Sequence, residues 1–282
     1  MQRQQSFINN ESTLYLVATP IGNLEDITFR AIRILKEVDI IFAEDTRVSK
    51  VLLDYYEIKT PLDSYHEFNK EEKGRKILSF LNEKKTVAVI SDAGMPIISD
   101  PGYTISKEAM QEGYNVVIIP GPSALLSGLV TSGINPHPFL FYGFLSNKAA
   151  SRKKALEKIK RATETLIFYE TPHRITKFLT DVKEILGNRK MALARELTKK
   201  FEEIIRGNVD EILEITDTLK GEMVVIIEGN SEQKNYDNLS IIEHINLYIK
   251  EGLSNMEAIK SVSKDRGMKK QEVYNAYHNE VK

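Results

Sequence analysis

Hydrophobic and polar positions alternate along the chain between two regular patterns. Short apolar runs such as Leu14–Thr19 and Thr86–Ser91 are typical of buried strands. Between these runs, apolar residues recur at helical spacing, as in residues 27–38, for which Asp26 is the expected N-cap. Alternating strands and helices of this kind predict a parallel sheet with helices on both faces.

Two such series are expected, and the Pro136-His137-Pro138 segment separates them. The strands expected before it are Leu14–Thr19, Val38–Ala43, Thr86–Ser91 and Asn115–Ile119. The helices expected before it are 27–38, Arg47–Tyr56, Glu71–Leu81 and Gly102–Glu112. The helical spacing of Arg47–Tyr56 predicts that Val48, Val51, Leu52 and Tyr55 are buried.

The second series resembles the first but ends differently. Its expected strands are Phe139–Phe144, Thr165–Tyr169, Met191–Glu196, Phe201–Arg206 and Met223–Glu228, and its expected helices are Lys148–Ala162, Arg174–Leu186 and Val209–Leu219. Two consecutive strands near residues 190–206 predict a mixed sheet. A polar linker is expected at Ser231–Asn238, followed by about three short helices that Gly252 and Gly267 separate.

The expected fold class is therefore α/β, with two α/β domains and a small helical domain at the end of the chain. The expected divisions are a disordered tail at 1–12, α/β domains at 13–120 and 121–232, and a helix-turn-helix-like domain at 239–282.

Composition narrows the classes of function. Lys and Arg total 39 against 40 Asp and Glu, so any nucleic-acid surface must be local. The absence of cysteine excludes disulfides, thiolate metal sites and a thiol nucleophile. The polar start has no apolar signal-peptide core and no run approaches ~18 apolar residues, so we expect a cytoplasmic protein without a membrane span.

The usual nucleotide and hydrolase signatures are missing. The chain has no GxxxxGK[ST] phosphate loop, no GxGxxG after the first strand and no Gly-x-Ser-x-Gly elbow. Its five histidines lack ligand spacing, so we expect no metal site. ATP binding, a dinucleotide fold and a serine hydrolase therefore have no support.

Polar loops follow the strands of the first series, where open α/β sheets bind ligands. They are 18–26, 43–47, 91–102 and 120–124. Residues 91–102 form a connection of twelve residues, against a usual ~2–6 for this type of loop. The ordinary alternative is that these residues only end strands and cap helices, as Asp45, Thr46 and Ser123 would.

In the second series, charged residues again cluster at strand ends, in 168–174 and 195–203. Arg174, Arg195 and Lys199 would face the same cleft, or they would form surface ion pairs. Residues 147–161 hold seven basic residues and one acid, which is typical either of a solvated helix face or of a helix that contacts RNA phosphates.

Taken together, these loops resemble the tetrapyrrole methylase superfamily and, within it, the ribosomal RNA small-subunit methyltransferase I family. The matching stretches are VATPIGNLEDIT at 17–28, AEDTRVSKVLL at 43–53, ISDAGMPIISDPG at 90–102, PGPSALLSGLVTSG at 120–133, FYGFL at 141–145, FYETPHR at 168–174 and RELTKKFEE at 195–203. Met95 is a departure, since threonine is expected at that position of the family pattern.

The resemblance implies that S-adenosylmethionine binds in the cleft between the two α/β domains. It also implies a homodimer and 2′-O-methylation of a cytidine ribose in the decoding region of small-subunit (16S) ribosomal RNA, as free RNA or in the 30S subunit. The donor contacts it implies are Pro20, Asp92, Ala93, Gly94, Met95, Ile98, Ser123, Ala124 and Tyr169.

Methyl transfer from a sulfonium needs alignment more than a metal or a covalent intermediate. A general base would help to ionise the acceptor hydroxyl, and Asp45, Glu170 and Glu196 are the candidates. Arg47, Arg174 and Arg195 would lower the hydroxyl pKa or bind phosphates. The alternative is that these pairs only lock loops.

Two other functions stay open at the level of sequence. One is a methylase that acts on a small tetrapyrrole-like substrate, and it would share the donor site. The other is a non-enzymatic nucleic-acid-binding regulator that uses the helical tail. The tail carries seven basic and six acidic residues, which disfavours independent DNA binding and also weakens its role in RNA binding.

Overall fold

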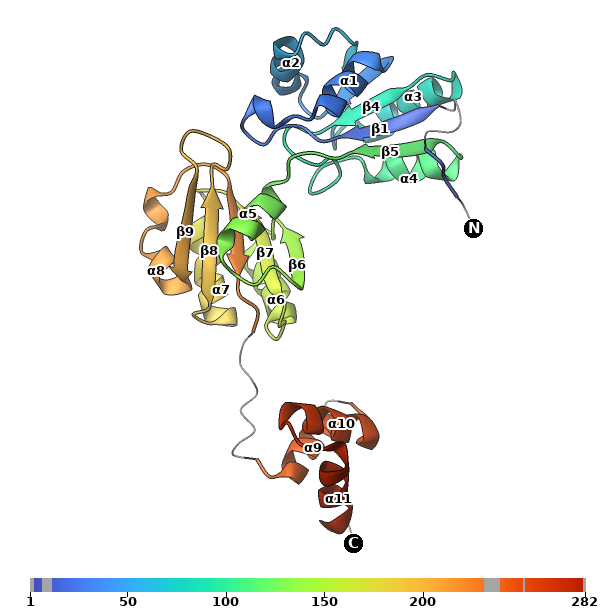
Figure 1. Cartoon of the computed structure of the whole chain (residues 1–282). Helices are drawn as coiled ribbons and strands as arrows, with labels where there is room; N and C mark the ends of the chain where they lie inside the picture. Colours follow the sequence, from blue (N-terminus) through green and yellow to red (C-terminus); the bar gives the residue numbers. More distant parts are fainter. Residues whose placement is uncertain (1–2, 7–11, 231–238, 251, 281–282) are drawn as a thin grey trace. The chain divides into compact units, whose positions relative to one another are not determined.

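The computed structural model describes residues 3–6, 12–230, 239–250 and 252–280. By its internal contacts the chain divides into two compact units, 1–230 and 231–282. The first unit contains two five-stranded sheets with their helices, and the second contains three helices (Figure 1). The α/β fold class with a helical region at the end is therefore confirmed.

The first sheet is entirely parallel, with strand order β3-β2-β4-β1-β5. Its strands are β1 (Thr13–Val17), β2 (Ile40–Ala43), β3 (Leu62–Ser64), β4 (Val87–Ile90) and β5 (Asn115–Ile119), and its helices are α1 (Phe29–Glu37), α2 (Thr46–Tyr55), α3 (Lys70–Asn82) and α4 (Tyr103–Gln111). Alternate residues of β2 pack on opposite faces: Ile41 joins the core under α1 and α2, and Phe42 joins the core under α3 and α4. Helices on both faces explain why four-residue strands such as β2 and β4 are wholly buried.

Two details of this half differ from the sequence-based expectation. Thr28, not Asp26, is the N-cap of α1, and its Oγ1 accepts a hydrogen bond from the Ala31 N–H at 3.1 Å. Asp26 instead ends a short 3₁₀ turn, Leu24–Asp26, because a second capping residue follows it by two positions.

The buried face of α2 was also predicted wrongly. Val48, Val51 and Tyr55 are 49%, 64% and 59% exposed. Leu52 is buried as predicted, but its buried companions are Ser49 and Leu53. Helical spacing identifies an apolar stripe, but it does not say which stripe meets the sheet.

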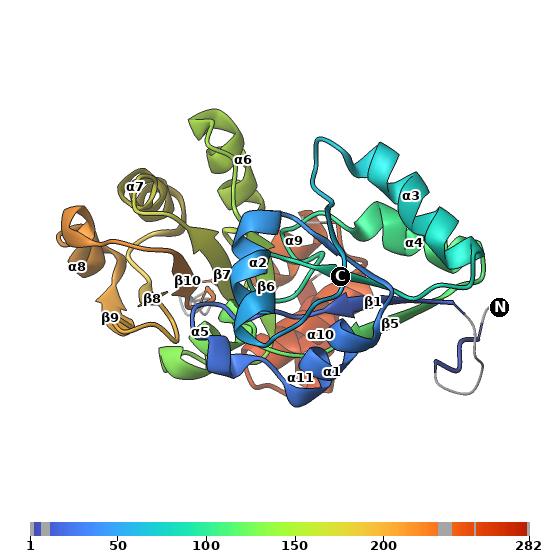
Figure 2. The same cartoon turned by 90° about the horizontal axis from the view of Figure 1, so that it is seen from above.

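The second sheet is mixed, as predicted, with order β6-β7-β10-β8-β9. Its strands are β6 (Phe139–Gly143), β7 (Thr165–Glu170), β8 (Lys190–Arg195), β9 (Glu203–Asn208) and β10 (Met223–Ile227). Helices α6 (Ala149–Ile159), α7 (Ile175–Leu186) and α8 (Val209–Leu213) share one core, and α5 (Ala124–Ser132) packs on the other face of the sheet (Figure 2).

Strand β9 begins two residues later than expected, because residues 196–202 form a turn. Helix α8 is shorter than expected and is followed by a separate 3₁₀ turn, Thr216–Thr218. Among the described residues, no helix is both long and apolar enough to cross a bilayer.

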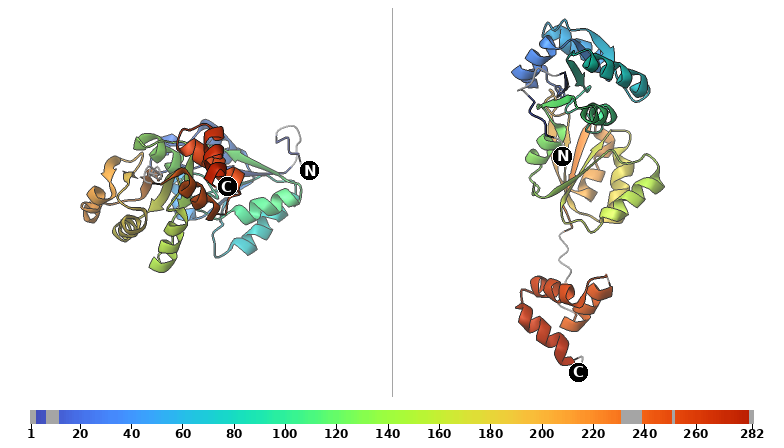
Figure 3. Two further views of the ribbon diagram at one scale, coloured as in Figure 1. Left: turned by 90° about the horizontal axis from the view of Figure 1, so that it is seen from below. Right: turned by 90° about the vertical axis from the view of Figure 1, so that its right-hand side faces the viewer.

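The second unit packs α9 (Ile241–Lys250), α10 (Asn255–Asp265) and α11 (Lys270–Glu280) around a small core of its own (Figure 3). Ile245, Ile259 and Val273 are the centre of that core. A capping box of Ser254 and Glu257 begins α10. The expected linker at 231–238 lies outside the described residues.

The start of the chain is partly described. The Gln4 side-chain amide donates to Val116 O at 3.0 Å and accepts from Val116 N at 3.1 Å. This part of the expected disordered tail therefore pairs with β5, the edge strand of the first sheet. Residues 1–2 and 7–11 of the tail lie outside the described residues.

Candidate functional site

A cavity of about 410 Å³ lies within the first unit, where loops of the first sheet meet the second sheet. It is lined by Ile21, Asp92, Ala93, Gly94, Met95, Ile98, Ser99, Asp100, Ser123, Ala124, Leu125, Leu126, Phe141, Phe144, Tyr169, Glu170, Ala194, Glu196, Leu197, Lys199, Glu222, Met223 and Val224. The loops after β1, β4 and β5 supply one side of this wall, as the edge rule for parallel sheets predicts.

Hydrogen bonds hold the loops after β1 and β4 together. Thr19 and Gly94 exchange backbone hydrogen bonds of 2.9 and 3.0 Å. The Thr19 hydroxyl donates to Ser91 O at 3.0 Å, and the Ser91 hydroxyl donates to Gly94 O at 3.1 Å. Gly94 has φ of +83°, a conformation that favours glycine, so the residue type suits the tight Asp92-Ala93-Gly94 turn.

The rest of that loop stores backbone strain. Ile97 and Ser99 have φ of +77° and +68°, and the left-handed region is a genuine outlier for a β-branched residue. A Cβ added to Gly143, at the end of β6, would lie 2.7 Å from Ser99 Oγ. The loop is therefore packed directly against the second sheet, and strain of this kind concentrates at binding sites.

The cavity is acidic. Asp92, Asp100, Glu170, Glu196 and Glu222 line it, and Lys199 is the one cationic side chain among its described lining residues. Burial, together with the nearby charges of Glu44 and Asp92, raises the pKa of Asp100 to about 7. Burial also raises the pKa of Asp92. Such a wall favours a ligand that carries positive charge.

Most of the predicted donor contacts lie in this wall. Asp92, Ala93, Gly94, Met95, Ile98, Ser123, Ala124 and Tyr169 all line the cavity. Pro20 does not line it, although its neighbour Ile21 does. Ser123 also caps α5 and accepts from the Leu126 N–H at 3.4 Å, so its capping interpretation holds as well.

The predicted catalytic residues separate into two groups. Glu170 and Glu196 line the cavity, whereas Asp45, Arg47, Arg174 and Arg195 do not. Arg195 Nε donates a hydrogen bond of 2.6 Å to the carboxylate of Glu203 on the neighbouring strand.

Asp45 instead caps α2 and positions its neighbours. Its carboxylate accepts Arg47 Nε at 3.0 Å and Arg47 Nη2 at 2.6 Å, and the bond with Arg47 lowers the Asp45 pKa to about 2. The Asp45 N–H donates to Asp92 Oδ1 at 2.9 Å. Asp45 thus fixes the orientation of a cavity carboxylate from outside the cavity.

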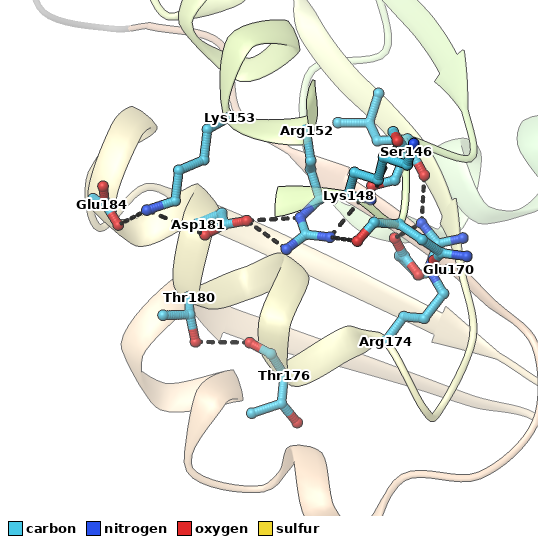
Figure 4. A network of polar contacts seen from close by, with 12 residues as sticks. Ser146, Lys148, Arg152, Lys153, Glu170, Arg174, Thr176, Thr180, Asp181 and Glu184 are labelled. Carbon is cyan, nitrogen blue, oxygen red and sulfur yellow. Dashed lines mark hydrogen bonds and ion pairs between the residues drawn. The ribbon is translucent and has the colours of Figure 1, made fainter. Parts of the chain in front are cut away.

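Glu170 belongs to a buried polar network (Figure 4). Its side chain pairs with Arg174 at 3.1 Å and accepts from the Thr171 N–H at 3.1 Å. Arg174 also donates to Leu145 O. Burial raises the pKa of Glu170. The pair holds the end of β7 against the end of β6.

The basic segment 147–161 is not a uniform cationic face. Arg152 is buried, with Nη2 2.6 Å from Asp181, and it donates to the carbonyl oxygens of Ser146 and Asn147 (Figure 4). Lys153 pairs with Glu184 at 2.6 Å. Two of the seven basic residues therefore stabilise the second sheet's helices, and fewer are left for RNA than the sequence suggested.

Several lining residues were missed from sequence. Met223 and Val224 begin β10, which runs antiparallel to β7 and β8, and Met223 pairs with Glu170 and with Arg195. The start of an antiparallel strand thus lies at the same edge as the ends of its neighbours. A rule based on the carboxyl ends of strands does not find the start of β10. Asp100, in contrast, belongs to the loop 91–102 that the sequence had already indicated.

Comparison with known proteins agrees with this geometry. The family of Tetrapyrrole (Corrin/Porphyrin) Methylases matches residues 13–213. The ribosomal RNA small subunit methyltransferase I of Bacillus subtilis is 50% identical over 289 residues, 99% of each chain. The protein of the same name from Thermotoga maritima is 46% identical over 218 residues, which cover 77% of this chain and 98% of the relative.

Among solved structures, uroporphyrin-III C-methyltransferase from Thermus thermophilus, complexed with S-adenosyl homocysteine, matches with a TM-score of 0.56. It is 21% identical and covers 77% of this chain and 97% of its own, so it supports the fold.

The fold and the cavity between its two sheets define a tetrapyrrole methylase-type methyltransferase. Within that class, the identity to the Bacillus subtilis protein over nearly the whole length of both chains is decisive. The chain belongs to the ribosomal RNA small subunit methyltransferase I family.

Proposed function

We propose that this protein transfers the methyl group of S-adenosylmethionine to the 2′-hydroxyl of a cytidine ribose in the decoding region of small-subunit (16S) ribosomal RNA. The observation that carries the proposal is the acidic cavity formed by loops of both sheets in a chain of this family. A cytoplasmic location follows from such a substrate.

The cavity residues fit the donor. Its volume of about 410 Å³ lies within the range of ~300–1,000 Å³ that small-molecule sites occupy. Apolar side chains such as Ile21, Leu125 and Phe141 suit an adenine ring. The carboxylates of Asp92 and Asp100 suit a cationic sulfonium group. In this proposal, Asp92, Ala93, Gly94, Met95, Ile98, Ser123, Ala124 and Tyr169 contact the donor.

When bound, the donor supplies a methyl group activated by a positively charged sulfur. The protein's main task is to align that group with the acceptor oxygen, which can contribute roughly 7–11 kcal/mol. The strained loop after β4 and the Asp45–Asp92 hydrogen bond serve this task, because both restrict the orientation of residues in the cavity wall.

RNA would bind through local basic surfaces. Exposed Lys148, Lys154 and Lys158 lie on or beside α6. Arg47, Lys50 and Lys59 line a hollow of about 480 Å³ between α2 and the edge strand β3. Together they offer phosphate contacts that a small macrocyclic substrate would not need, which favours RNA over a tetrapyrrole.

We also propose that the protein is a homodimer. Val48, Val51 and Tyr55 form an exposed stripe on α2, and Phe29 is 94% exposed at the start of α1. The Tyr56 hydroxyl donates to Leu24 O at 2.7 Å, which brings the end of α2 close to the segment before α1. An exposed apolar surface of this kind is typical of a subunit interface.

The experiment that tests the proposal is transfer of an isotopically labelled methyl group to 30S subunits and to free 16S RNA. Nuclease digestion and mass spectrometry then locate the label. We expect one 2′-O-methylcytidine. A label on a base, or transfer to a tetrapyrrole but to neither RNA substrate, would overturn the proposal.

A further inference from the structure

The turn between β8 and β9, residues 196–202, contains Lys199, the one cationic residue among the described residues that line the cavity. Glu196 and Lys199 both line the cavity, and the Lys199 Nζ lies 3.0 Å from Glu196 Oε1. The Glu196 side chain is 20% exposed and that of Lys199 is 34% exposed. The pair is thus partly shielded from water and open toward the ligand space.

The backbone of this turn is strained. Glu196 and Thr198 have φ of +50° and +67°, and Thr198 is β-branched. Thr198 Oγ1 is buried without a hydrogen-bond partner among the described residues. The Thr198 N–H donates to Glu202 at 2.6 Å, which closes the turn. A surface ion pair contributes less to stability than the backbone strain and a buried hydroxyl without a hydrogen bond cost. We therefore expect this turn to have a functional role beyond stability.

Two glycines make room for the pair. A Cβ at Gly221 would lie 2.1 Å from Glu196 Oε1, so the carboxylate rests directly on the backbone before β10. A Cβ at Gly22 would lie 2.5 Å from Lys199 Cγ, so the lysine stem rests on the loop after β1. Segments from both sheets therefore fix where the carboxylate and the ammonium lie.

The other two candidates for a general base are paired with arginines that do not line the cavity. Asp45 lies outside the cavity lining and is bonded to Arg47. Glu170 has a fully buried side chain that is paired with Arg174. Among the three carboxylates that the sequence offered, Glu196 is the one that lines the cavity together with its ion-pair partner, Lys199.

We propose that Glu196 and Lys199 are the catalytic pair that acts on the acceptor hydroxyl. The bond from the acceptor oxygen to the methyl carbon forms as the bond from sulfur to that carbon breaks. The hydroxyl proton passes to the Glu196 carboxylate and then to water, and the sulfonium becomes a neutral thioether. Lys199 stabilises the negative charge that develops on the oxygen and holds the Glu196 carboxylate in place through the ion pair. This inference rests on the proposed function.

The test compares Glu196→Gln, Lys199→Met and Lys199→Arg with Lys200→Met as the matched control. Lys200 is exposed on the same turn and lies 5.6 Å from the Phe201 ring, not in the cavity lining. We expect kcat to fall about 100-fold or more for Glu196→Gln and Lys199→Met, with KM for RNA changed little. Lys199→Arg keeps part of the rate, and Lys200→Met stays within about twofold of the wild type.

Calorimetry separates a chemical role from a structural one. Lys199→Met removes a positive charge from the cavity, so the cationic donor is expected to bind as tightly as before or tighter, and the neutral product is expected to bind unchanged. If the pair only locks the turn, both ligands bind more weakly and the variant melts at a lower temperature.

The two proposals fail in different ways. If the wild type methylates no RNA, the proposed function is wrong. If the wild type methylates RNA and both Glu196→Gln and Lys199→Met keep kcat within about threefold, the catalytic pair alone is wrong.

Discussion

At the scale of single residues, folding strongly raises the pKa of the Asp100 carboxyl group. Its pKa is raised to about 7 by burial and by the charges of Glu44 and Asp92, from an ordinary value of ~3.9. The folded protein therefore holds this proton more tightly than the unfolded chain does. The resulting stability is complete below about pH 4 and is lost as the pH rises through about 7.

Asp100→Asn tests this sign, because asparagine is neutral at every pH. We expect the variant to melt at a higher temperature than the wild type at pH 8 without donor, and the difference to shrink at pH 5. Thermal unfolding at the two pH values measures it. An equal difference at both would show that Asp100 is not protonated in the folded state.

The loop 91–102 was located from the sequence because a twelve-residue connection with two Asp-containing turns has few ordinary explanations. The sequence did not predict the raised pKa of Asp100, because Glu44 lies at the end of β2 and Asp92 at the end of β4. Such an effect depends on which strands are neighbours, and only the fold decides that.

At the scale of elements, helix α6 shows how a charge pattern misleads. The count of basic residues in 147–161 suggested one phosphate-binding face, yet Arg152 lies inside the protein against Asp181. The pair is costly to break from one side, since the buried Asp181 would keep only Lys153, whose Nζ lies 3.6 Å from its Oδ1.

Arg152→Met is therefore expected to destabilise the protein by about 3–5 kcal/mol in denaturant unfolding. The matched control is Lys154→Met on the exposed face of α6, which we expect to change stability by about 0.5 kcal/mol or less. Similar stability of the two variants would show that the Arg152–Asp181 pair does not hold α6 on α7.

In helix α2, the pattern of apolar residues was misleading in the same way. Its position and length followed from spacing, but the expected burial of Val48, Val51 and Tyr55 did not hold. In the proposed homodimer, this stripe is covered by a second copy of the chain.

Val51→Glu places a charge in that stripe at a site that is exposed in the single chain. We expect sedimentation velocity to show monomers for the variant and dimers for the wild type at the same micromolar concentration, because burying an unpaired carboxylate is unfavourable. The monomeric variant keeps its melting cooperativity. Dimers of equal strength would exclude this stripe as the interface.

At the scale of the whole molecule, the chain combines a two-sheet unit with a helical unit that has its own core. The Thermotoga maritima relative is matched over 98% of its length by 77% of this chain, which is close to the size of the two-sheet unit alone. The described residues that line the cavity all belong to the first unit. The alternating pattern predicted the two sheets and the helices after them, whereas the contacts group both sheets in one unit, 1–230, and the expected linker lies outside the described residues.

Deletion of residues 240–282 is expected to leave donor affinity unchanged and to weaken RNA binding about three- to tenfold, since the tail has only a slight excess of basic residues. Donor calorimetry and RNA binding at a fixed salt concentration measure the two effects. Unchanged RNA affinity would remove the tail from the binding surface.

The central claim is that the acidic cavity holds the methyl donor. Calorimetric titration of the protein with S-adenosylmethionine, beside Asp92→Asn, tests it most directly. Asparagine keeps an oxygen that can accept the Asp45 N–H and removes only the charge. We expect micromolar-range binding by the wild type and binding about tenfold weaker in the variant, with a melting temperature no lower than that of the wild type. No binding by the wild type, or equal affinity in both proteins, would contradict it.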